Sequence, residues 1–353
     1  MNDFSKYTID KSASVRDALI KLNTLSGDVL TLFIMDGKRL IGTMTDGDIR
    51  RFLIKEDSLN VSVEKVMERN FNYIHQGEKN VQKIKKIRSA GIKLIPCISE
   101  TGELLEIFDL KHKKSILPVD AVLMAGGKGE RLRPLTEKTP KPLLKIGEKA
   151  IIDYNVDHLI NYGIENIHVT TNYLAEQIEE HFKNERQGVK INCVREKEFL
   201  GTIASIKLIP YLKNDEILVM NSDLFTNVDF EDFYRHFIEK EADMSAAAIP
   251  YSVNVPYGIF ELEGRNIQGI KEKPTYNYYA NAGIYLIKKE LLDIIPDRKY
   301  FNVTDFMELL VLRGKTVIRY PLTGYWIDIG KFADYQKAQD IAEHVKYKDL
   351  NNV

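Results

Sequence analysis

The sequence has few of the features that would identify a particular class of protein, such as a disulfide-rich, metal-binding or membrane protein. Only two cysteines, Cys97 and Cys193, occur in 353 residues, and neither lies in a metal-binding or redox motif. We therefore expect packed thiols rather than a disulfide or metal ligands, and a reducing, cytoplasmic setting fits best. No apolar run approaches the roughly 18 residues of a membrane span. The start of the chain also lacks the basic and apolar regions of a secretory signal.

Net charge is nearly absent as well. Lysine and arginine together number 50 against 51 acidic residues, which leaves a formal charge of -1. Such a balance gives no reason to expect nucleic acid or an anionic membrane as a partner. The seven histidines are scattered without the spacing of a metal or catalytic cluster. With 44% hydrophobic residues, the chain is long enough for two or three domains with cores of their own.

The first third of the chain contains a degenerate internal repeat. Helix-like spacing in residues 14–25 precedes two strand-like runs, "LTLFIMD" and "RLIGTMT", and then a second helix-like segment. The order recurs about 65 residues later in "NVQKIKKIRSAG", "IKLIPCIS" and "ELLEIFD". We place the repeats at about residues 1–60 and 61–117, with the domain boundary in the basic, proline-containing stretch "KHKKSILPVD".

This repeat resembles a pair of cystathionine-β-synthase (CBS) motifs, most closely in "GTMTDGDIRR". The resemblance implies a small α/β CBS pair, an adenine-nucleotide site at Thr45 and Asp48, and homo-oligomers formed through the CBS domains. A hydroxyl can donate to a phosphate, and a carboxylate can accept from ribose hydroxyls. The alternative is that Thr45 and Asp46 only cap the following helix. The second repeat has no hydroxyl residue three positions before an acid, which argues against a second nucleotide site.

From residue 118 onward, strand-like and helix-like segments alternate. "DAVLMAG" has the continuous apolar character of a buried parallel strand. The alternation predicts a Rossmann-like, doubly wound and mostly parallel sheet, with "TIASIKLIPYL" among its helices. Beyond residue 251 the pattern becomes strand-rich and suggests a β region that closes over the sheet. Ligands on such sheets bind beyond the carboxyl ends of the strands.

The stretch "AGGKGERLRPLT", at the end of the first of these strands, has the composition of a phosphate-holding loop. It lacks P-loop spacing, and Leu132 stands where the dinucleotide fingerprint needs its third glycine. A dehydrogenase on a dinucleotide fold therefore lacks its first requirement. Backbone N–H groups of Gly126, Gly127 and Gly129 can approach phosphate oxygens, and Arg131 can hold the same oxygens. A plain turn is the simpler alternative.

Together with "PKPLL", this loop resembles the signature of the sugar-1-phosphate nucleotidyltransferase family, in particular the mannose-1-phosphate guanylyltransferases. Five further pieces agree in order: "LGT", "NSD", "EKP", "NAGIY" and "WIDIG". The resemblance spans about residues 119–339 and makes residues 118–353 an enzyme domain with a β-rich sugar-binding part. It implies transfer of a nucleoside monophosphate from a nucleoside triphosphate to a sugar 1-phosphate, with pyrophosphate as the second product and Mg²⁺ as cofactor.

The resemblance also implies roles for individual residues. The catalytic residues are Arg131, Lys141 and Asp223, with Lys141 between the reacting phosphates. Asp223 and Asp328 are the Mg²⁺ ligands, and an uncompensated carboxylate at the end of a buried strand would indeed be costly. The nucleotide side comprises Gly126, Gly127, Gly129, Glu196, Gly201 and Thr202. The sugar-phosphate side comprises Gly258, Glu272, Lys273, Asn281 and Gly283.

Simpler alternatives stay open at this point. Lys141 can be a surface lysine, the two aspartates can cap helices, and Asn281 and Gly258 can serve turns. A Glu196 carboxylate matches the adjacent N1–H and N2–H₂ donors of guanine and favours GTP. If the backbone reads the base instead, UTP, dTTP or CTP is the substrate. Mannose, glucosamine and glucose 1-phosphates are equally open, and a nucleotide-sensing regulatory protein with an inactive transferase domain is the alternative class.

Overall fold

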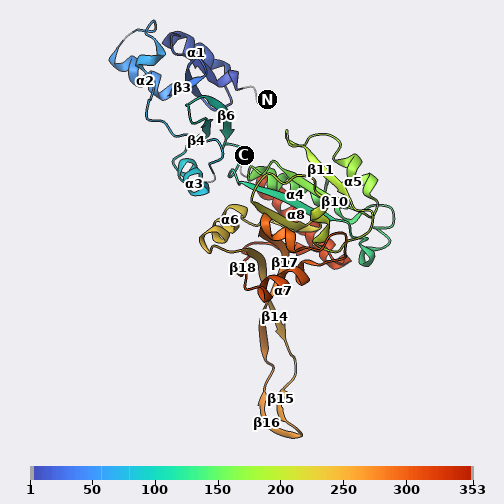
Figure 1. Cartoon of the computed structure of the whole chain (residues 1–353). Helices are drawn as coiled ribbons and strands as arrows, with labels where there is room; N and C mark the ends of the chain where they lie inside the picture. The colour runs from blue at the N-terminus through green and yellow to red at the C-terminus, as the bar shows by residue number, and fades with distance from the viewer. Residues whose placement is uncertain (1–3, 57, 79, 351–353) are drawn as a thin grey trace. The chain divides into compact units, whose positions relative to one another are not determined.

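The computed structural model describes residues 4–56, 58–78 and 80–350. The chain divides into two compact units, Met1–Ile116 and Leu117–Val353, next to the boundary predicted from the sequence. Figure 1 shows both units in ribbon form, coloured along the chain.

The first unit contains the predicted repeat. Each half has a three-stranded sheet in which the first strand pairs in parallel with the second and the second pairs antiparallel with the third. The first half comprises η1 (Ser5–Tyr7), β1 (Thr8–Asp10), α1 (Val15–Thr24), β2 (Thr31–Asp36), β3 (Arg39–Thr45) and α2 (Asp46–Lys55). The second half comprises η2 (Val63–Lys65), β4 (Ile74–His75), α3 (Val81–Ser89), β5 (Leu94–Ile98) and β6 (Leu104–Asp109). The predicted order of a helix followed by two strands is therefore confirmed in both halves, and each half also has a short strand before its helix, β1 or β4, that was not predicted.

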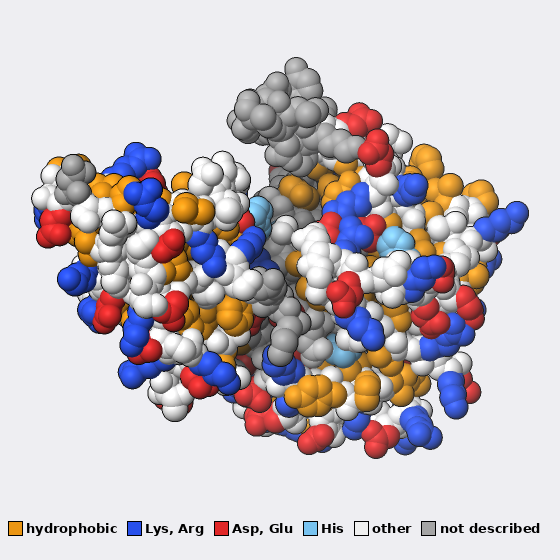
Figure 2. All heavy atoms as spheres, turned by 90° about the horizontal axis from the view of Figure 1, so that it is seen from above, with side chains coloured by type: hydrophobic (Ala, Val, Ile, Leu, Met, Phe, Trp, Pro, Cys, Tyr) orange, Lys and Arg blue, Asp and Glu red, His pale blue; other side chains and the backbone are white. Residues whose placement is uncertain are grey.

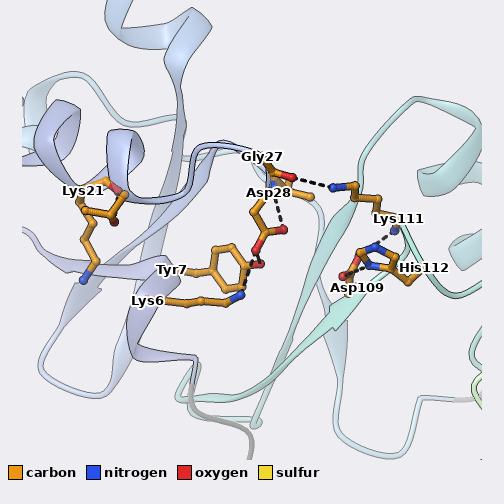
Figure 3. Close-up of polar contacts among 10 residues, drawn as sticks. Lys6, Tyr7, Lys21, Gly27, Asp28, Asp109, Lys111 and His112 are labelled. Carbon is orange, nitrogen blue, oxygen red and sulfur yellow. Dashed lines mark hydrogen bonds and ion pairs between the residues drawn. The ribbon is translucent and has the colours of Figure 1, made fainter. Parts of the chain in front are cut away.

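Hydrogen bonds hold the loop at Gly27 and Asp28 and join the two halves of this unit. In Figure 3, Asp28 accepts hydrogen bonds from Lys6 Nζ at 2.9 Å and Tyr7 Oη at 2.7 Å. Lys111, which follows β6, donates from its Nζ to the carbonyl oxygen of Gly27 at 3.1 Å. A residue of the second half thus anchors a loop of the first, so the repeats form one unit.

The second unit is built on a seven-stranded sheet with the order β11-β10-β7-β12-β17-β14-β18. Its strands, with the short pairs beside it, are β7 (Val119–Ala125), β8 (Lys145–Ile146), β9 (Lys149–Ala150), β10 (Ile167–Thr171), β11 (Ile191–Arg195), β12 (Glu216–Asn221), β13 (Leu224–Thr226), β14 (Met244–Asn254), β15 (Ile259–Glu263), β16 (Asn266–Lys271), β17 (Thr275–Lys288), β18 (Val317–Pro321) and β19 (Trp326–Asp328). Its helices are η3 (Glu130–Leu132), η4 (Lys141–Leu143), α4 (Ile151–Asn161), α5 (Ala175–His181), η5 (Ala204–Leu208), α6 (Phe230–Glu239), η6 (Lys289–Ile294), α7 (Val303–Leu312) and α8 (Phe332–Leu350).

The sheet is mixed rather than wholly parallel. Strands β11, β10, β7 and β12 are parallel neighbours, whereas β17 runs antiparallel to both β12 and β14. Every residue of β10 is buried, as expected for a strand covered on both faces. Ile217 and Val219 of β12 pack in one cluster with Phe306 of α7. A parallel-strand α/β core is therefore confirmed, with an antiparallel strand inserted beside it.

One predicted helix is much shorter than expected. Of "TIASIKLIPYL", only Ala204–Leu208 is helical, and it forms a 3-10 helix. Gly201 just before it adopts a φ of +90°, and Pro210 follows it, so a regular helix has little room on either side. The β-branched side chains of Ile203, Ile206 and Ile209 are buried in the same hydrophobic cluster as β12 and α7, and this packing outweighs the helical propensity of the segment.

The strand-rich region does not close over its own sheet, which corrects the expectation from the sequence. Beyond Ala248, β14 pairs only with β17, from Ile249↔Ala280 to Asn254↔Thr275, and the β15–β16 hairpin continues from there. Residues 249–281, here called the arm, project from the body of the second unit (Figure 1). None of them is buried. The period-two pattern identified these strands correctly, but it carries no information on where a two-stranded ribbon points.

The surface carries both charge signs side by side. Figure 2 shows basic and acidic side chains interspersed over the face it presents, in keeping with the net charge of -1. Among the described residues, no helix is long and apolar enough to span a bilayer. Cys97 is buried and Cys193 is half-buried, and both are free thiols, as expected.

Candidate active site

A cavity of about 580 Å³ lies at the carboxyl ends of β7 and β12 in the second unit. This is the edge at which ligands of parallel sheets are expected to bind. The residues predicted for the nucleotide side and for catalysis meet there. The cavity lining includes Gly126, Gly127, Gly129, Arg131, Lys141, Glu196, Gly201, Thr202 and Asp223.

Close contacts restrict two of the glycines in the loop after β7, Gly126 and Gly129. A Cβ on Gly126 would lie 2.8 Å from Glu196 Oε1, so a side chain at this position would displace that carboxylate. Gly129 has a φ of +62°, and a Cβ there would lie 3.1 Å from the Cβ of Lys141. Thr136 Oγ1 donates a hydrogen bond to the Gly129 carbonyl oxygen at 2.8 Å. The loop is therefore held against both the carboxylate of Glu196 and the backbone that carries Lys141.

A buried lysine between two carboxylates forms the charged centre of the site. Lys141 is only 8% exposed, so the alternative of a surface lysine is wrong. Its Nζ bonds to Asp223 Oδ2 and lies 3.8 Å from Asp328 Oδ1. Lys141 begins η4 directly after Pro140, so the "PKP" sequence fixes the backbone from which its side chain enters the cavity.

Strand pairing explains why two aspartates distant in sequence lie close together. Leu224, next to Asp223, is the register partner of Asp328 where β13 pairs with β19. The N–H of Ile329 also donates to the Asp223 carbonyl oxygen at 3.2 Å. Neither aspartate is the N-cap of a helix, which rules out the capping alternative. Asn155, from α4, holds the turn by donating its Nδ2 to the carbonyl oxygens of Ser222 and Leu224 at 3.2 and 2.9 Å.

The donor set around Lys141 suits a divalent cation. Asp223 Oδ1 is buried and has no hydrogen-bond partner among the described residues. Burial, and then the nearby negative charge of Asp223, raise the pKa of Asp328 above its usual value. Two carboxylates that repel each other, one with an unused oxygen, are ligands that Mg²⁺ accepts while keeping further positions for phosphate oxygens and water.

Arg131 completes the positive side of the site. Its guanidinium lies against Gly330, where a Cβ would be 3.2 Å from Nη2. Its charge acts to lower the pKa of Asp328, against the larger effects of burial and Asp223. Arg131 is exposed, whereas Lys141 is buried, so the two cations meet the cavity at different depths.

Glu196 is buried at the wall of the cavity rather than pointing to solvent. It is 3% exposed, and its Oε2 accepts a hydrogen bond from the N–H of Leu200 at 2.9 Å. Burial raises the pKa of its carboxyl group above the usual value, although the bond from Leu200 acts to lower it. One carboxylate oxygen therefore holds the loop before "LGT", and the other faces Gly126.

The "LGT" segment is tied to the chain near residue 301. Gly201 adopts a φ of +90°, and a Cβ there would lie 2.6 Å from the carbonyl oxygen of Phe301. Thr202 Oγ1 accepts a hydrogen bond from the N–H of Val303 at 2.9 Å. These contacts fix the wall that both residues form on the cavity.

The predicted sugar-side residues separate into two groups. Gly283 has a φ of +70°, and a Cβ there would lie 2.5 Å from Nδ2 of Asn221, which lines the cavity. Asn281 Oδ1 accepts from the Gly283 N–H at 3.0 Å, as in the turn alternative. By contrast, Gly258, Glu272 and Lys273 lie on the arm, outside this cavity's lining. The structure therefore does not bring these three to the site of their own chain.

Sequence reasoning missed two residues of this site. Asn172 lines the cavity and donates from its Nδ2 to the Glu196 carbonyl oxygen at 3.1 Å. Asn172 directly follows the buried strand β10. A polar residue at the end of a buried strand is the signal that pointed to Asp223, and it could have identified Asn172 as well. Asn155 lies within helix α4, where no local pattern distinguishes it from other polar helix residues.

In the first unit, Thr45 and Asp48 cap a helix and also line a cavity. Thr45 is the N-cap of α2, and its N–H and hydroxyl both donate to Asp48 Oδ2 at 2.7 Å. Arg51 pairs with the same carboxylate. All three border a cavity of about 480 Å³ that also reaches Lys93 of the second half. The capping alternative is thus realised, together with a space that can hold a ligand.

Comparisons with known proteins agree with this architecture. A family model described as Nucleotidyl transferase matches residues 120–344. D-glycero-alpha-D-manno-heptose 1-phosphate guanylyltransferase of Aneurinibacillus thermoaerophilus is 30% identical over 229 residues, which cover 64% of this chain and 99% of that protein. Mannose-1-phosphate guanyltransferase beta-B of Xenopus laevis is 30% identical over 226 residues, covering 61% of this chain and 62% of that protein. This chain thus spans less than two thirds of the length of the mannose-1-phosphate relative.

A solved structure shows the same fold. A Bacillus anthracis protein, assigned as a glucose-1-phosphate thymidylyltransferase and solved with sucrose, superposes with a TM-score of 0.52 at 26% identity. The match covers 64% of this chain and 95% of the other. The family match extends over more than half of the chain and includes every residue of the cavity described above. The chain therefore belongs to the nucleotidyl transferase family.

Proposed function

We propose that this protein transfers a nucleoside monophosphate, with GTP as the favoured donor, to a sugar 1-phosphate. A phosphate oxygen of the sugar attacks the α-phosphorus, the bond from that phosphorus to the β-phosphate oxygen breaks, and pyrophosphate leaves. The observation that carries the proposal is the buried Lys141, which lies between Asp223 and Asp328 in the wall of a glycine-lined cavity. An anionic nucleophile attacking an anionic phosphate needs positive charge fixed in advance.

The residues divide the work by position. The N–H groups of the loop at Gly126–Gly129 hold the triphosphate without a side chain in the way. Arg131, at the exposed side, offers forked donors to the leaving pyrophosphate. Lys141 lies deeper and neutralises the reacting phosphates while its two carboxylate partners fix its direction. Positioning of this kind leaves little covalent work to the protein.

Asp223 and Asp328 are the residues that would hold Mg²⁺. When bound, the ion supplies charge neutralisation for the phosphate oxygens at the reacting centre. The unpartnered Oδ1 of Asp223 supports this assignment.

The base preference rests on Glu196 and on the relatives. Two of the similar proteins are named as guanylyltransferases, for mannose 1-phosphate and for a heptose 1-phosphate. Glu196 lines the cavity with one oxygen already engaged by Leu200. UTP, dTTP or CTP replaces GTP if the backbone alone reads the base.

A substrate grid tests the proposal. Pyrophosphate release is measured with Mg²⁺ for each of five nucleoside triphosphates against mannose, glucosamine, glucose and N-acetylglucosamine 1-phosphates. We expect release with GTP and one or few of the sugars, and its loss in Asp223→Asn. Release with UTP or dTTP alone would contradict the role of Glu196. Absence of release in all combinations, with nucleotide still bound, would favour the alternative of a regulatory protein with an inactive transferase domain.

The first unit is proposed as a CBS pair that senses an adenine nucleotide and forms homo-oligomers. The cavity bordered by Thr45, Asp48 and Arg51 supports a phosphate and ribose site. Replacing Thr45 and Asp48 by alanine should abolish the effect of AMP or ATP on turnover and leave basal turnover intact.

A matched control separates ligand binding from helix capping. Ser14 and Asp17 form the same capping box on α1, yet they do not line the cavity. Replacing that pair by alanine should cost a similar stability, about 1 kcal/mol per cap, and should keep the nucleotide effect. An unchanged nucleotide response in the Thr45 and Asp48 variant would place the regulatory site elsewhere.

A further inference from the structure

The arm exposes an apolar surface that the described chain does not cover. On one face of the β15–β16 hairpin, Phe260 is the register partner of Ile270, and Leu262 is the partner of Ile267. All four side chains are 55% to 62% exposed. The opposite face of the hairpin is polar, with an ion pair between Lys271 and Glu261. The hairpin is therefore amphipathic, with its apolar face turned to solvent.

Such a ribbon needs a partner to be stable. A two-stranded hairpin alone is marginal in water, and contiguous exposed apolar patches mark interaction surfaces. Further exposed apolar side chains continue along the arm, namely Tyr251, Val253, Tyr257, Tyr278 and Tyr279. A stable interface takes about 20–30 residues from each side, and the arm is of that size. The arm has the dimensions and composition of one half of a subunit interface.

The same arm carries two residues that the proposed reaction needs at the cavity. Glu272 and Lys273 belong to the "EKP" motif that resembles a sugar 1-phosphate site, and neither lines the cavity of its own chain. The ladder from Thr275 to Asn281 is continuous, so these residues lie about 20 Å or more along the ribbon from the cavity edge. The ribbon projects away from the body of the unit (Figure 1), so this part of the chain lies far from its own cavity.

We propose, resting on the function above, that the arm of a second copy of this chain covers the cavity and supplies Glu272 and Lys273 to the sugar 1-phosphate. Only another copy carries the same motif, so the second copy is the occupant that completes the site. Exchange of identical arms about a two-fold axis closes the assembly and leaves no arm exposed.

The mouth of the cavity offers a surface for the arm's apolar face. Phe199 lines the cavity and is 46% exposed, and its ring lies 6.0 Å from that of Tyr300, which is 60% exposed. The ribbon also begins at the cavity edge, because Gly283 of β17 lies against Asn221. Each chain therefore presents an aromatic rim at its cavity and an apolar arm. In a dimer, the arm of each copy can cover the rim of the other.

A heterodimer complementation experiment tests the proposal. One chain carries Lys141→Met with an intact arm, and the other carries Lys273→Met with an intact cavity. The two are co-expressed with different affinity tags and purified through both tags. Each homodimeric variant should be inactive, whereas the heterodimer holds one complete site and should show about half of the wild-type pyrophosphate release. A heterodimer in which both chains carry Lys141→Met and one also carries Lys273→Met is the matched inactive control.

Each outcome decides. A heterodimer as inactive as its parents, beside an active wild type, overturns the exchange, as does failure of the chains to co-purify. Full activity of Lys273→Met alone also overturns it. If the wild type releases no pyrophosphate with any substrate, the proposed function fails instead, and cross-linking decides the docking. One chain carries Lys273→Cys and the other Lys128→Cys, and the two are co-expressed and purified through both tags. Treatment with a bismaleimide should link them into a dimer that neither variant forms alone, and the absence of this dimer overturns the docking.

The apolar face has its own test. Phe260→Ser combined with Ile270→Ser should raise the KM for sugar 1-phosphate at least about tenfold and leave the KM for nucleotide little changed. Leu312→Ser removes a side chain that is 84% exposed on α7 of the same unit and should change neither value. Equal effects on both KM values, or none, would contradict the docking of this face over the sugar side.

Discussion

Replacing Lys141 by methionine removes one charge from the centre of the site and keeps most of the side chain's length. Lys141 Nζ lies 3.8 Å from Asp328 Oδ1 and is bonded to Asp223. At such a distance a charge pair is worth about 4 kcal/mol near a protein surface, and less here because the Asp328 side chain is 42% exposed. We expect a stability loss of about 1–3 kcal/mol, set mainly by the carboxylate oxygens left unpaired.

The catalytic effect of this substitution should be larger than its effect on stability. Removing one charged donor from a developing transition state costs about 3–4 kcal/mol, so kcat for pyrophosphate release should fall about 10²–10³-fold. The double variant Lys141→Met with Asp223→Asn removes the orphaned charge, so its unfolding free energy should recover toward the wild type while turnover stays lost. Turnover of Lys141→Met within about tenfold of the wild type would refute the role of this lysine.

Two further predictions concern the packing of the second unit. Gly126→Ala should displace Glu196 from its 2.9 Å bond with Leu200 and lower the free energy of unfolding, measured by chemical denaturation, by about 1–3 kcal/mol. The control is Gly127→Ala, whose Cβ would meet nothing within 4 Å. Equal stability of the two variants would contradict the contact between Gly126 and Glu196. His168 is 4% exposed and burial lowers its pKa, so stability should fall as the pH drops from about 6.5 through the folded pKa. His168→Leu should remove that part of the pH dependence in denaturation curves, and an unchanged pH profile would show that another group causes it.

The sequence predicted the charged centre well because long motifs carry it. "PKP" locates Lys141 and "NSD" locates Asp223, 82 positions apart, and the structure places them in contact. The backbone at Ser222, within "NSD", has no positive φ, so a residue with a side chain fits there without strain. Ser222 even uses its hydroxyl to bond the carbonyl oxygen of Met124 at 2.7 Å.

Other features depend on contacts that no local pattern reveals. Glu196 was expected from its place before "LGT", but its burial and its bond to Leu200 follow from the packing of a distant loop. Asn155 stabilises the turn after β12 from the interior of helix α4. No local pattern distinguishes it there from the other polar residues of the helix. The strands of the arm were recognisable by their alternation, whereas their direction depends on which neighbour they pair with, and beyond Ala248 they have only each other.

The fate of each phosphate of GTP tests the central claim most directly. GTP labelled at the α-phosphate, and separately at the γ-phosphate, is incubated with Mg²⁺, the protein and the sugar 1-phosphate identified by the grid. The account predicts that the α label appears in the sugar nucleotide and the γ label in pyrophosphate, both at rates that depend on the sugar 1-phosphate. Appearance of the α label in free GMP, or of the γ label in inorganic phosphate without any sugar nucleotide, would contradict nucleotidyl transfer and assign the site to hydrolysis.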